Sequence, residues 1–419
     1  MTNTITAAVH TLGCKVNQCD GEALISKLQK AGISIQKFDQ KSDIYIINTC
    51  TVTHTSDKKS LQMIRRARKF NPSAFIAVCG CLPNSLNETP DKITIAGADF
   101  IFDTRKPELL LDKLSEIYQP PAATLPVTSI PTRTRAFIKI QDGCDRYCTY
   151  CIVPYVRGPI QSRPLSDILE EAKKHIKNGA LEIVITGIQV ASYGYDTGCV
   201  RLPELIKHLV ELEPKRLRLS SIDPWAVDDA FLSVVDNSPT LCSHFHLSLQ
   251  SGSDKTLANM NRRYTTKDYA KAANKLKNLR SNVALTTDII VGFPGETDED
   301  FKESLHFAED MGFSKIHVFE YSQRAGTQAA TFPNQVPSQV KSARGEEMRA
   351  LAKKLEQIFM NKQIGTNMPV LFETKTNPNT WQGHTENYCT VQVQGTDMAG
   401  TIQKVKITGI SGNSLIGQY

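Results

Sequence analysis

Apolar and polar positions over residues 1–117 repeat in the order strand, helix, strand. Short apolar runs typical of buried strands alternate with stretches of helical spacing, and the first of these ends at Gly32. The predicted strands are residues 4–11, 43–48 and 74–78, and the predicted helices are residues 17–31 and 56–70. Because successive βαβ units cross over with the same hand, they imply a parallel sheet. Residues 1–117 are therefore predicted to form an N-terminal α/β domain with an open parallel sheet.

The alternation is interrupted at residues 118–132, which contain four prolines and no charged side chain and are typical of a stiff linker. Six strand and helix units follow within residues 133–365. Their strands are residues 136–141, 181–186, 216–221, 244–249, 283–291 and 315–321. The clearest helices are residues 166–178, which end at Gly179, and residues 298–311, which begin with a capping box of Thr297 and Asp300. Six such units predict a partial (β/α)6 barrel, in which the chemistry lies on loops after the strands.

The pattern changes again after a long helix that runs from Pro337 to Gly365. Short alternating strands follow at residues 368–372, 389–393, 401–407 and 414–417. Residues 366–419 are therefore predicted to form a small β-barrel of the oligonucleotide-binding kind.

Composition places this α/β chain among ordinary globular proteins. Of its 419 residues, 49 are basic and 43 acidic, which gives a net charge of +6. That balance permits an anionic partner such as RNA without requiring one. The N-terminus has no basic segment followed by an apolar core, and no apolar run approaches membrane-spanning length. We therefore expect a cytoplasmic protein without membrane contact.

Eleven cysteines in a protein expected in the cytosol are more plausible as metal ligands than as disulfides. Cys144, Cys148 and Cys151 stand in a C-x3-C-x2-C spacing directly after the first strand of the predicted barrel. Three thiolates on one loop can ligate three irons of a 4Fe-4S cluster and leave the fourth iron open to S-adenosylmethionine. The alternative is zinc, but structural zinc takes four ligands and no fourth Cys or His stands at a matching spacing nearby.

Three more cysteines are spread over the N-terminal domain. Cys14, Cys50 and Cys81 each come just after one of the three predicted strands. Because loops at the carboxyl ends of parallel strands converge on one crevice, we expect these thiols to meet and to hold a second cluster with one open iron. The alternative is that they are small buried side chains, which is common for cysteine.

The cysteine loop resembles that of the radical S-adenosylmethionine superfamily, which has an aromatic residue, here Tyr150, before the last cysteine. Nearly the whole chain is similar to the methylthiotransferases of that superfamily. Several runs are similar to the branch that acts on threonylcarbamoyladenosine in tRNA: residues 11–18, 48–53, 139–144, 148–154, 216–221 and 246–253. In one departure, the family's Thr-Gly-Cys is Cys79-Gly80-Cys81 here, and alignment to that motif selects Cys81.

The resemblance implies that an aromatic C–H of the modified adenine, beside the anticodon, is replaced by a methylthio group. Such a carbon is neither acidic nor nucleophilic, so a radical is required. The implied cofactors are S-adenosylmethionine and two 4Fe-4S clusters. One cluster would cleave S-adenosylmethionine reductively, and the other, on Cys14, Cys50 and Cys81, would carry the sulfur. The implied partners are the anticodon stem-loop of tRNA and an electron donor such as a flavodoxin or ferredoxin.

The resemblance also implies binding roles for residues near the strand ends, although each alone is compatible with ordinary turn chemistry or a solvated charge. The S-adenosylmethionine set is Tyr150, Thr186, Gly187, Ser220, Ser221, Gln250, Ser251, Asp288, Ile290 and Gly292. The RNA set is Arg65, Arg66, Arg157, Arg163, His384 and Tyr388. His244 and His246 alternate on one predicted strand and are assigned no role.

Two kinds of alternative remain open. A sister methylthiotransferase acts on isopentenyladenosine in tRNA or on an aspartate of a ribosomal protein. A protein of a different class, a non-catalytic iron-sulfur RNA-binding redox sensor, would have its fourth iron blocked by a protein ligand.

Overall fold

The computed structural model describes residues 5–85, 89–118 and 134–419, which form two compact units. Among the described residues, unit 1 comprises 5–85, 89–118, 142–160 and 322–330, and unit 2 comprises 134–141, 161–321 and 331–419. The cysteine loop thus belongs to the same unit as the N-terminal sheet. The predicted linker, residues 118–132, lies outside the described residues except for Tyr118, so it stays a prediction, as do the domain boundaries.

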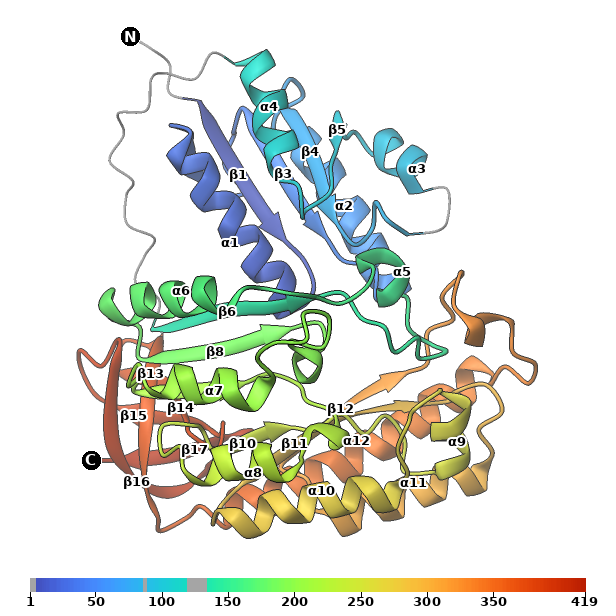
Figure 1. Ribbon diagram of the computed structural model, residues 1–419, viewed down its shortest axis with the longest axis vertical. Helices are drawn as coiled ribbons and strands as arrows, with labels where there is room; N and C mark the ends of the chain where they lie inside the picture. Colours follow the sequence, from blue (N-terminus) through green and yellow to red (C-terminus); the bar gives the residue numbers. More distant parts are fainter. Residues whose placement is uncertain (1–4, 86–88, 119–133) are drawn as a thin grey trace. The chain divides into compact units, whose positions relative to one another are not determined.

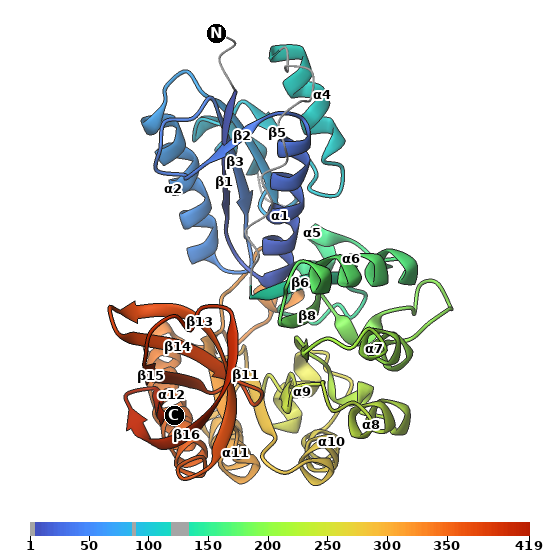
Figure 2. The ribbon, with the colours of Figure 1, turned by 90° about the vertical axis from the view of Figure 1, so that its left-hand side faces the viewer.

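A five-stranded parallel sheet with the order β2-β1-β3-β4-β5 forms the centre of unit 1 (Figure 1). Its strands are β1 (Thr6–Thr11), β2 (Ser34–Gln36), β3 (Ile44–Thr49), β4 (Phe75–Gly80) and β5 (Phe100–Ile101). Its helices are α1 (Lys15–Lys30), α2 (His54–Phe70), α3 (Thr89–Ile95), α4 (Glu108–Ile117) and α5 (Val153–Arg157). The sheet separates α1 and α4 from α2, and each face has its own apolar core (Figure 2). The predicted parallel sheet is confirmed.

Unit 2 contains a layer of strands, most of which pair in parallel, with helices on its outer face (Figure 1). Its strands are β6 (Arg135–Asp142), β7 (Gln161–Ser162), β8 (Glu182–Gly187), β9 (Arg216–Leu219), β10 (His244–His246), β11 (Ala284–Val291) and β12 (Lys315–Glu320). Its helices are α6 (Leu165–Lys177), α7 (Leu202–Val210), α8 (Asp229–Asp236), α9 (Asp254–Asn259), α10 (Thr266–Leu279) and α11 (Asp298–Met311).

The strands of unit 2 form the predicted partial barrel. They pair in the orders β7-β6-β8-β9 and β10-β11-β12, and isolated bridges from Leu217 to Leu241 and from Ile222 to Leu247 join the two sheets. Helix α11 begins at the predicted capping box, in which Thr297 and Asp300 each accept a hydrogen bond from the other's backbone N–H. The barrel prediction is therefore confirmed, with β9 and β10 shorter than expected.

A closed five-stranded barrel follows helix α12 (Ser338–Asn361) and confirms the predicted C-terminal fold (Figure 2). Its strands are β13 (Asn367–Asn377), β14 (Thr380–Thr385), β15 (Thr390–Gln394), β16 (Thr401–Ser411) and β17 (Ser414–Gln418). Strand β14 was not predicted because its inward positions include Gly383. A Cβ there would lie 2.3 Å from the Leu371 carbonyl oxygen, so the close packing of the strands leaves room only for glycine at this position.

No helix in the described parts of the chain combines the length and apolarity needed to cross a bilayer.

Candidate functional site

The three N-terminal cysteines lie at one edge of the sheet in unit 1. Cys14 immediately precedes α1, Cys50 follows β3, and Cys81 follows β4. Strands β1, β3 and β4 are neighbours and parallel, so the loops that carry these residues leave the sheet on the same side. Cys50 and Cys81 are buried and Cys14 is exposed.

The three thiols are close enough for their charges to interact. Burial raises the pKa of Cys81 to about 11, Arg157 opposes this shift, and the charges of Cys14 and Cys50 add to it. Gly13 adopts a φ of +99°, and a Cβ there would lie 2.9 Å from the Cys50 Sγ atom. The backbone before Cys14 therefore approaches Cys50 as only glycine permits. The predicted convergence of the three cysteines agrees with this geometry.

Cys79 has different surroundings from Cys81 although only Gly80 separates them. Its side chain is wholly buried in the apolar core under α1 and α4, together with Leu24 and Leu28. Burial raises the pKa of Cys79 to about 12, although a hydrogen bond with Thr104 opposes the shift. Cys79 therefore packs into the core from within β4, whereas Cys81 lies beyond the strand's end.

The C-x3-C-x2-C loop is held by backbone hydrogen bonds within unit 1. The Cys144 N–H donates to the Gly158 carbonyl at 3.0 Å, and the Cys151 N–H donates to the Cys148 carbonyl at 2.9 Å. Gly143 has a φ of +71°, and a Cβ there would lie 1.8 Å from the Pro159 carbonyl oxygen. The loop therefore closes on itself at a point where only glycine fits.

Arg157 connects the two cysteine groups in unit 1. Its Nε donates to the Cys81 Sγ at 3.4 Å, and its Nη1 donates to Asp142 at 2.9 Å and to Asp20 at 3.1 Å. Its Nη2 donates to the Asn17 Oδ1. Burial alone would lower the pKa of Arg157, but Cys81 and the two carboxylates raise it well above its ordinary value.

The sequence predicts an RNA contact for Arg157, and the structure corrects this. Only 7% of the residue is exposed, and its guanidinium is surrounded by carboxylates and a thiol of unit 1. Its role is to fix the cysteine loop against α1 and the end of β4. Nothing in the local sequence distinguishes it from a surface arginine, because its partners are distant in the chain.

Sequence reasoning missed a second buried arginine. Arg324 lies in the segment 322–330 and donates to Asp57 at 2.5 Å and to the Thr51 Oγ1 at 2.6 Å. The Thr51 hydroxyl in turn donates to Asp57 at 2.6 Å. This network attaches the segment that follows the last parallel strand to the loop after Cys50.

Several residues predicted to bind S-adenosylmethionine lie at the carboxyl ends of β8 and β9 in unit 2. Thr186 is buried, and Gly187 approaches Gln141 so closely that a Cβ would lie 3.1 Å from its Oε1. Ser220 follows β9 and is buried, and its hydroxyl has no hydrogen-bond partner among the described residues. An unpaired buried hydroxyl is costly, so Ser220 is suited to a bound polar ligand. Ser221 beside it is exposed.

The remaining residues of that set link the loop after β10 to β11. Gln250 has a φ of +75° and donates its N–H to the Asp288 carbonyl at 2.9 Å, and the Ile290 N–H donates to the Gln250 carbonyl at 2.9 Å. Gly292 also has a positive φ. The Ser251 Oγ lies 3.1 Å from the Ser304 Oγ, so its hydroxyl already has a protein partner. Tyr150 is half-buried in the cysteine loop of unit 1.

The remaining predicted RNA contacts fall into two groups. Arg65 and Arg66 are exposed on α2, and Arg163 is partly exposed with an ion pair to Glu171 at 2.7 Å. His384 and Tyr388 instead stack on each other, with ring centroids 5.1 Å apart.

Tyr388 also contacts the parallel layer of unit 2. Its ring lies against His244 and under Arg218, and its hydroxyl accepts a hydrogen bond from Arg135 at 3.1 Å. His384 lies 2.9 Å from Glu373. The pair therefore joins the closed barrel to the strands of the same unit.

Three segments of the chain match known protein families. Residues 138–308 match the radical SAM superfamily, residues 6–102 match the uncharacterized protein family UPF0004, and residues 361–419 match the TRAM domain.

Relatives match over almost their whole length. The threonylcarbamoyladenosine tRNA methylthiotransferase MtaB of Bacillus subtilis is 39% identical over 96% of this chain and 93% of that protein. The protein of the same name from Thermotoga maritima is 34% identical, over 98% and 96%. The tRNA-2-methylthio-N(6)-dimethylallyladenosine synthase of Clostridium tetani is 35% identical, over 98% and 95%.

Solved structures share the fold at low identity. The radical S-adenosylmethionine methyltransferase TsrM from Kitasatospora setae aligns with a TM-score of 0.57 at 13% identity, over 90% of this chain and 80% of that chain. The cobalamin-dependent S-adenosylmethionine radical enzyme OxsB gives 0.54 at 13% identity, over 86% and 56%.

Proposed function

The chain belongs to the radical S-adenosylmethionine methylthiotransferases, and from this membership we propose that it converts N6-threonylcarbamoyladenosine beside the anticodon of tRNA to its 2-methylthio derivative. The observation that carries the proposal is the match to relatives named for this activity over nearly the full chain, at up to 39% identity. The cysteine placement in unit 1 supports the same chemistry.

The cofactors of this enzyme class are S-adenosylmethionine and two 4Fe-4S clusters. We assign one cluster to Cys144, Cys148 and Cys151, and the other to Cys14, Cys50 and Cys81. The close approach of Gly13 to Cys50 and the position of Cys81 beyond β4 support the second assignment. When bound, these groups supply one-electron chemistry for a carbon that acid–base catalysis cannot activate.

The chain's own residues are proposed to bind S-adenosylmethionine and to orient the cysteine loop. Thr186, Gly187 and Ser220 at the ends of β8 and β9, with Ile290 and Gly292 at the end of β11, are proposed to hold S-adenosylmethionine. The unpaired hydroxyl of Ser220 supports this. Asp288 is left out of this proposed set because its carboxylate lies 3.2 Å from His246. Arg157 holds the cysteine loop in place and keeps its charge away from water.

The proposed substrate is a base in an RNA loop, where unstacking it into a pocket costs only a few kcal/mol. Exposed Arg65 and Arg66 on α2, with the C-terminal barrel, are proposed to contact the tRNA backbone. A flavodoxin or ferredoxin is the proposed electron donor, and the cytoplasm the proposed location.

Nucleoside mass spectrometry tests the substrate. In Bacillus subtilis cells that lack their own relative, this gene should restore the 2-methylthio derivative of threonylcarbamoyladenosine. Cys81→Ala and Cys148→Ala should each abolish the product, and Cys81→Ala should lower the iron content of the purified protein by about half. Cys79→Ala is the matched control and should keep both product and iron, because its thiol lies in the apolar core.

One observation favours a second substrate. A relative named for dimethylallyladenosine is 35% identical over 98% of the chain. This identity lies within the 34–39% of the two relatives named for threonylcarbamoyladenosine. Cluster-loaded protein that yields methylthio-dimethylallyladenosine, and none of the threonylcarbamoyl product, would replace the proposed substrate by this one. The non-catalytic sensor has no support among the comparisons.

A further inference from the structure

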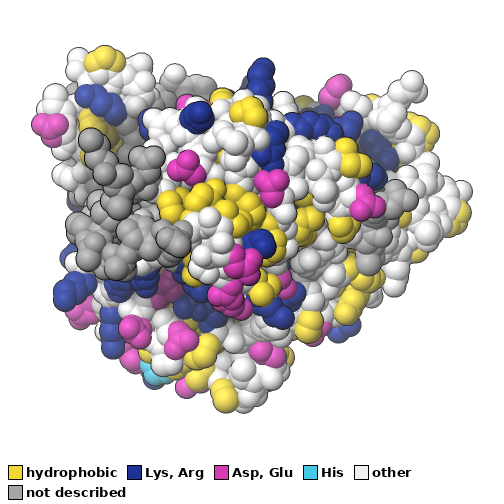
Figure 3. Space-filling model, turned by 90° about the horizontal axis from the view of Figure 1, so that it is seen from above, with side chains coloured by type: hydrophobic (Ala, Val, Ile, Leu, Met, Phe, Trp, Pro, Cys, Tyr) yellow, Lys and Arg dark blue, Asp and Glu magenta, His cyan; other side chains and the backbone are white. Residues whose placement is uncertain are grey.

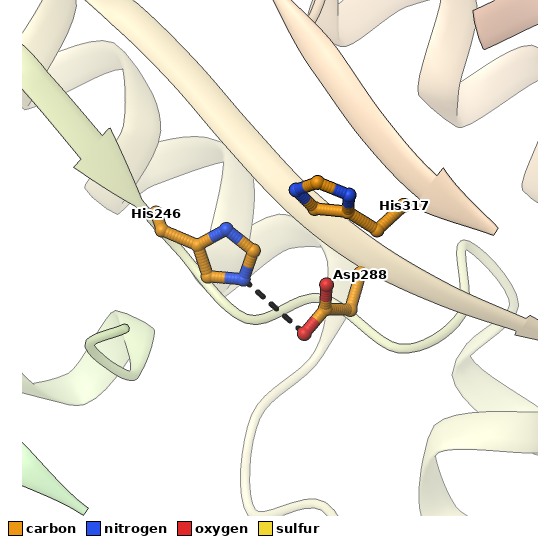
Figure 4. A group of neighbouring side chains, drawn as sticks. All are labelled: His246, Asp288 and His317. Carbon is orange, nitrogen blue, oxygen red and sulfur yellow. Dashed lines mark ion pairs between the residues drawn. The ribbon is translucent and has the colours of Figure 1, made fainter. Parts of the chain in front are cut away.

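Three side chains of cation-binding type meet on neighbouring strands of unit 2 (Figure 4). His246 ends β10, Asp288 lies in β11, and His317 lies in β12, and one ligand atom from each lies within 4.8 Å of the other two. Asp288 and His317 are register partners, and His246 is the register partner of Thr286. The strand pairing therefore brings the three together.

The group lies on the strand face opposite the helices. Along β11, Leu285, Ile289 and Val291 belong to the apolar core that the helices cover. Since successive side chains of a strand point to opposite faces, Asp288 points to the other side. His246 is 12% exposed and Asp288 29%, and His317 is exposed, so an ion can reach the group from solvent.

The orientation of His246 suits a metal ligand. Its Nδ1 lies 3.1 Å from the Thr286 Oγ1, which fixes the ring and leaves Nε2 as the ligand atom. This Nε2 is 3.2 Å from Asp288 Oδ2, yet it is buried without a hydrogen-bond partner among the described residues. Two atoms that are close but not aligned as a hydrogen bond are arranged like two ligands of one ion. Around a tetrahedral zinc with bonds of about 2.0–2.1 Å, neighbouring ligand atoms lie about 3.3 Å apart.

We propose that His246, Asp288 and His317 form a binding site for a divalent first-row transition-metal ion such as Zn²⁺. Two neutral imidazoles and one carboxylate match the nitrogen and oxygen preference of such ions and leave further coordination positions open. Thr286 is a positioning residue, because its hydroxyl sets the His246 ring and also lies 3.1 Å from His244 Nε2.

The test uses the full-length protein with both clusters loaded under anaerobic conditions, so that the cysteines are occupied. Zn²⁺ binding is measured by equilibrium dialysis, and the ligands by X-ray absorption at the zinc edge. We expect one tightly bound zinc with nitrogen and oxygen ligands at about 2.0–2.1 Å and no sulfur at about 2.3 Å. Thr286→Val should weaken zinc binding by about 10–100-fold.

His317→Ala and Asp288→Asn should each remove the tight site. His317 is exposed and Asp288→Asn preserves shape, so both variants should fold. His175→Ala is the matched control, because His175 also faces a carboxylate, Glu171 at 3.7 Å, and both side chains are partly exposed on α6. The proposal is overturned if the wild type binds no more zinc than His317→Ala, if His175→Ala removes the site, or if the bound zinc has sulfur ligands.

Discussion

Buried arginines are the residues that hold the candidate site of unit 1 together. Arg157 pairs with Asp142 and Asp20, and Arg324 pairs with Asp57, and both have less than a tenth of their surface exposed. A buried ion pair adds little net stability over a well-packed apolar pair, but removing one partner leaves a charge without compensation. These residues therefore specify how the loops lie more than they stabilise the fold.

Arg157→Met should lower the free energy of unfolding by about 3–5 kcal/mol, because it removes the buried cation that two buried carboxylates share. Arg349→Met is the matched control, since Arg349 makes an exposed ion pair with Glu320 and should lose about 0–1 kcal/mol. Denaturant unfolding of both variants and the wild type, followed by circular dichroism, gives the comparison. Equal losses in the two variants would mean that Arg157 is better solvated than its contacts indicate.

At the scale of elements, the cysteine loop depends on one backbone turn. Gly143 directly follows β6, and a side chain there would collide with the Pro159 carbonyl at 1.8 Å. The atoms that this Cβ would meet belong to the backbone of Pro159 and Gly158, so the collision can be relieved only by moving the loop. The positions of Cys144 and its neighbours are thus set by a residue that takes no part in chemistry.

Gly143→Ala should displace the loop and lower the iron content by about half, as loss of one cluster requires. Gly179→Ala is the control: Gly179 also has a positive φ, +88°, but no atom lies within 4 Å of a Cβ built there. That variant should cost about 1 kcal/mol and keep its iron. Iron and sulfide are measured after anaerobic reconstitution. Full iron content in Gly143→Ala would mean that the substitution causes only local strain and does not remove the site.

At the scale of the whole molecule, a buried charge network joins the parallel layer and the closed barrel of unit 2. Glu182 on β8 is wholly buried and accepts two hydrogen bonds from Arg218 on β9, at 2.8 and 3.0 Å. Arg218 and Arg216 also donate to carbonyl groups of the barrel, at Glu386 and His384, both at 2.9 Å. The barrel is therefore fixed to the layer through arginines that Glu182 neutralises.

Glu182→Gln should make the protein less stable by about 3–5 kcal/mol at pH 7. Burial alone would raise the pKa of Glu182, but the charge and hydrogen bonds of Arg218 lower it overall from 4.5. A depressed folded-state pKa gives stability above pH 4.5 that is lost as the pH falls through the folded value. The stability gap between variant and wild type should therefore narrow below pH 4.5 in denaturation curves. Glu116 is exposed, so the control variant Glu116→Gln should be as stable as the wild type both at pH 7 and below pH 4.5.

The surface charge of the molecule is modest for an RNA-binding enzyme. The net charge is +6, and the face in Figure 3 has basic side chains in separate groups among acidic and apolar ones. Binding to tRNA should thus depend on a few local cations rather than on one continuous basic field.

Arg65→Ala combined with Arg66→Ala should weaken tRNA binding. The slope of its salt dependence should fall by the equivalent of up to about two phosphate contacts. Both arginines are exposed on α2. Lys113→Ala, which removes an exposed lysine of α4 paired with Glu116, should change neither quantity. Filter binding over a range of salt concentrations measures both. An unchanged slope in the double variant would place the RNA surface elsewhere.

The sequence by itself determined the parallel sheet of unit 1, the partial barrel and the closed C-terminal barrel, and it singled out the two cysteine groups that the proposal uses. Apolar periodicity, the Thr297 capping box and the cysteine spacing are local signals, each complete within a few residues. Strands β2, β5 and β7 were not predicted because each is only two or three residues long, and β14 was not predicted because it contains a glycine where an apolar side chain was expected.

Only the tertiary structure decided which polar residues meet. Arg157 is buried, and Tyr388 connects the barrel to the strands of unit 2. His246, Asp288 and His317 lie close together. The physical reason is that a charge or an imidazole carries no periodic signal: its environment is set by strand register and by partners far away in the chain. Cys79 and Cys81 differ by their place relative to β4, because Cys79 packs into the core from within the strand and Cys81 lies beyond the strand's end.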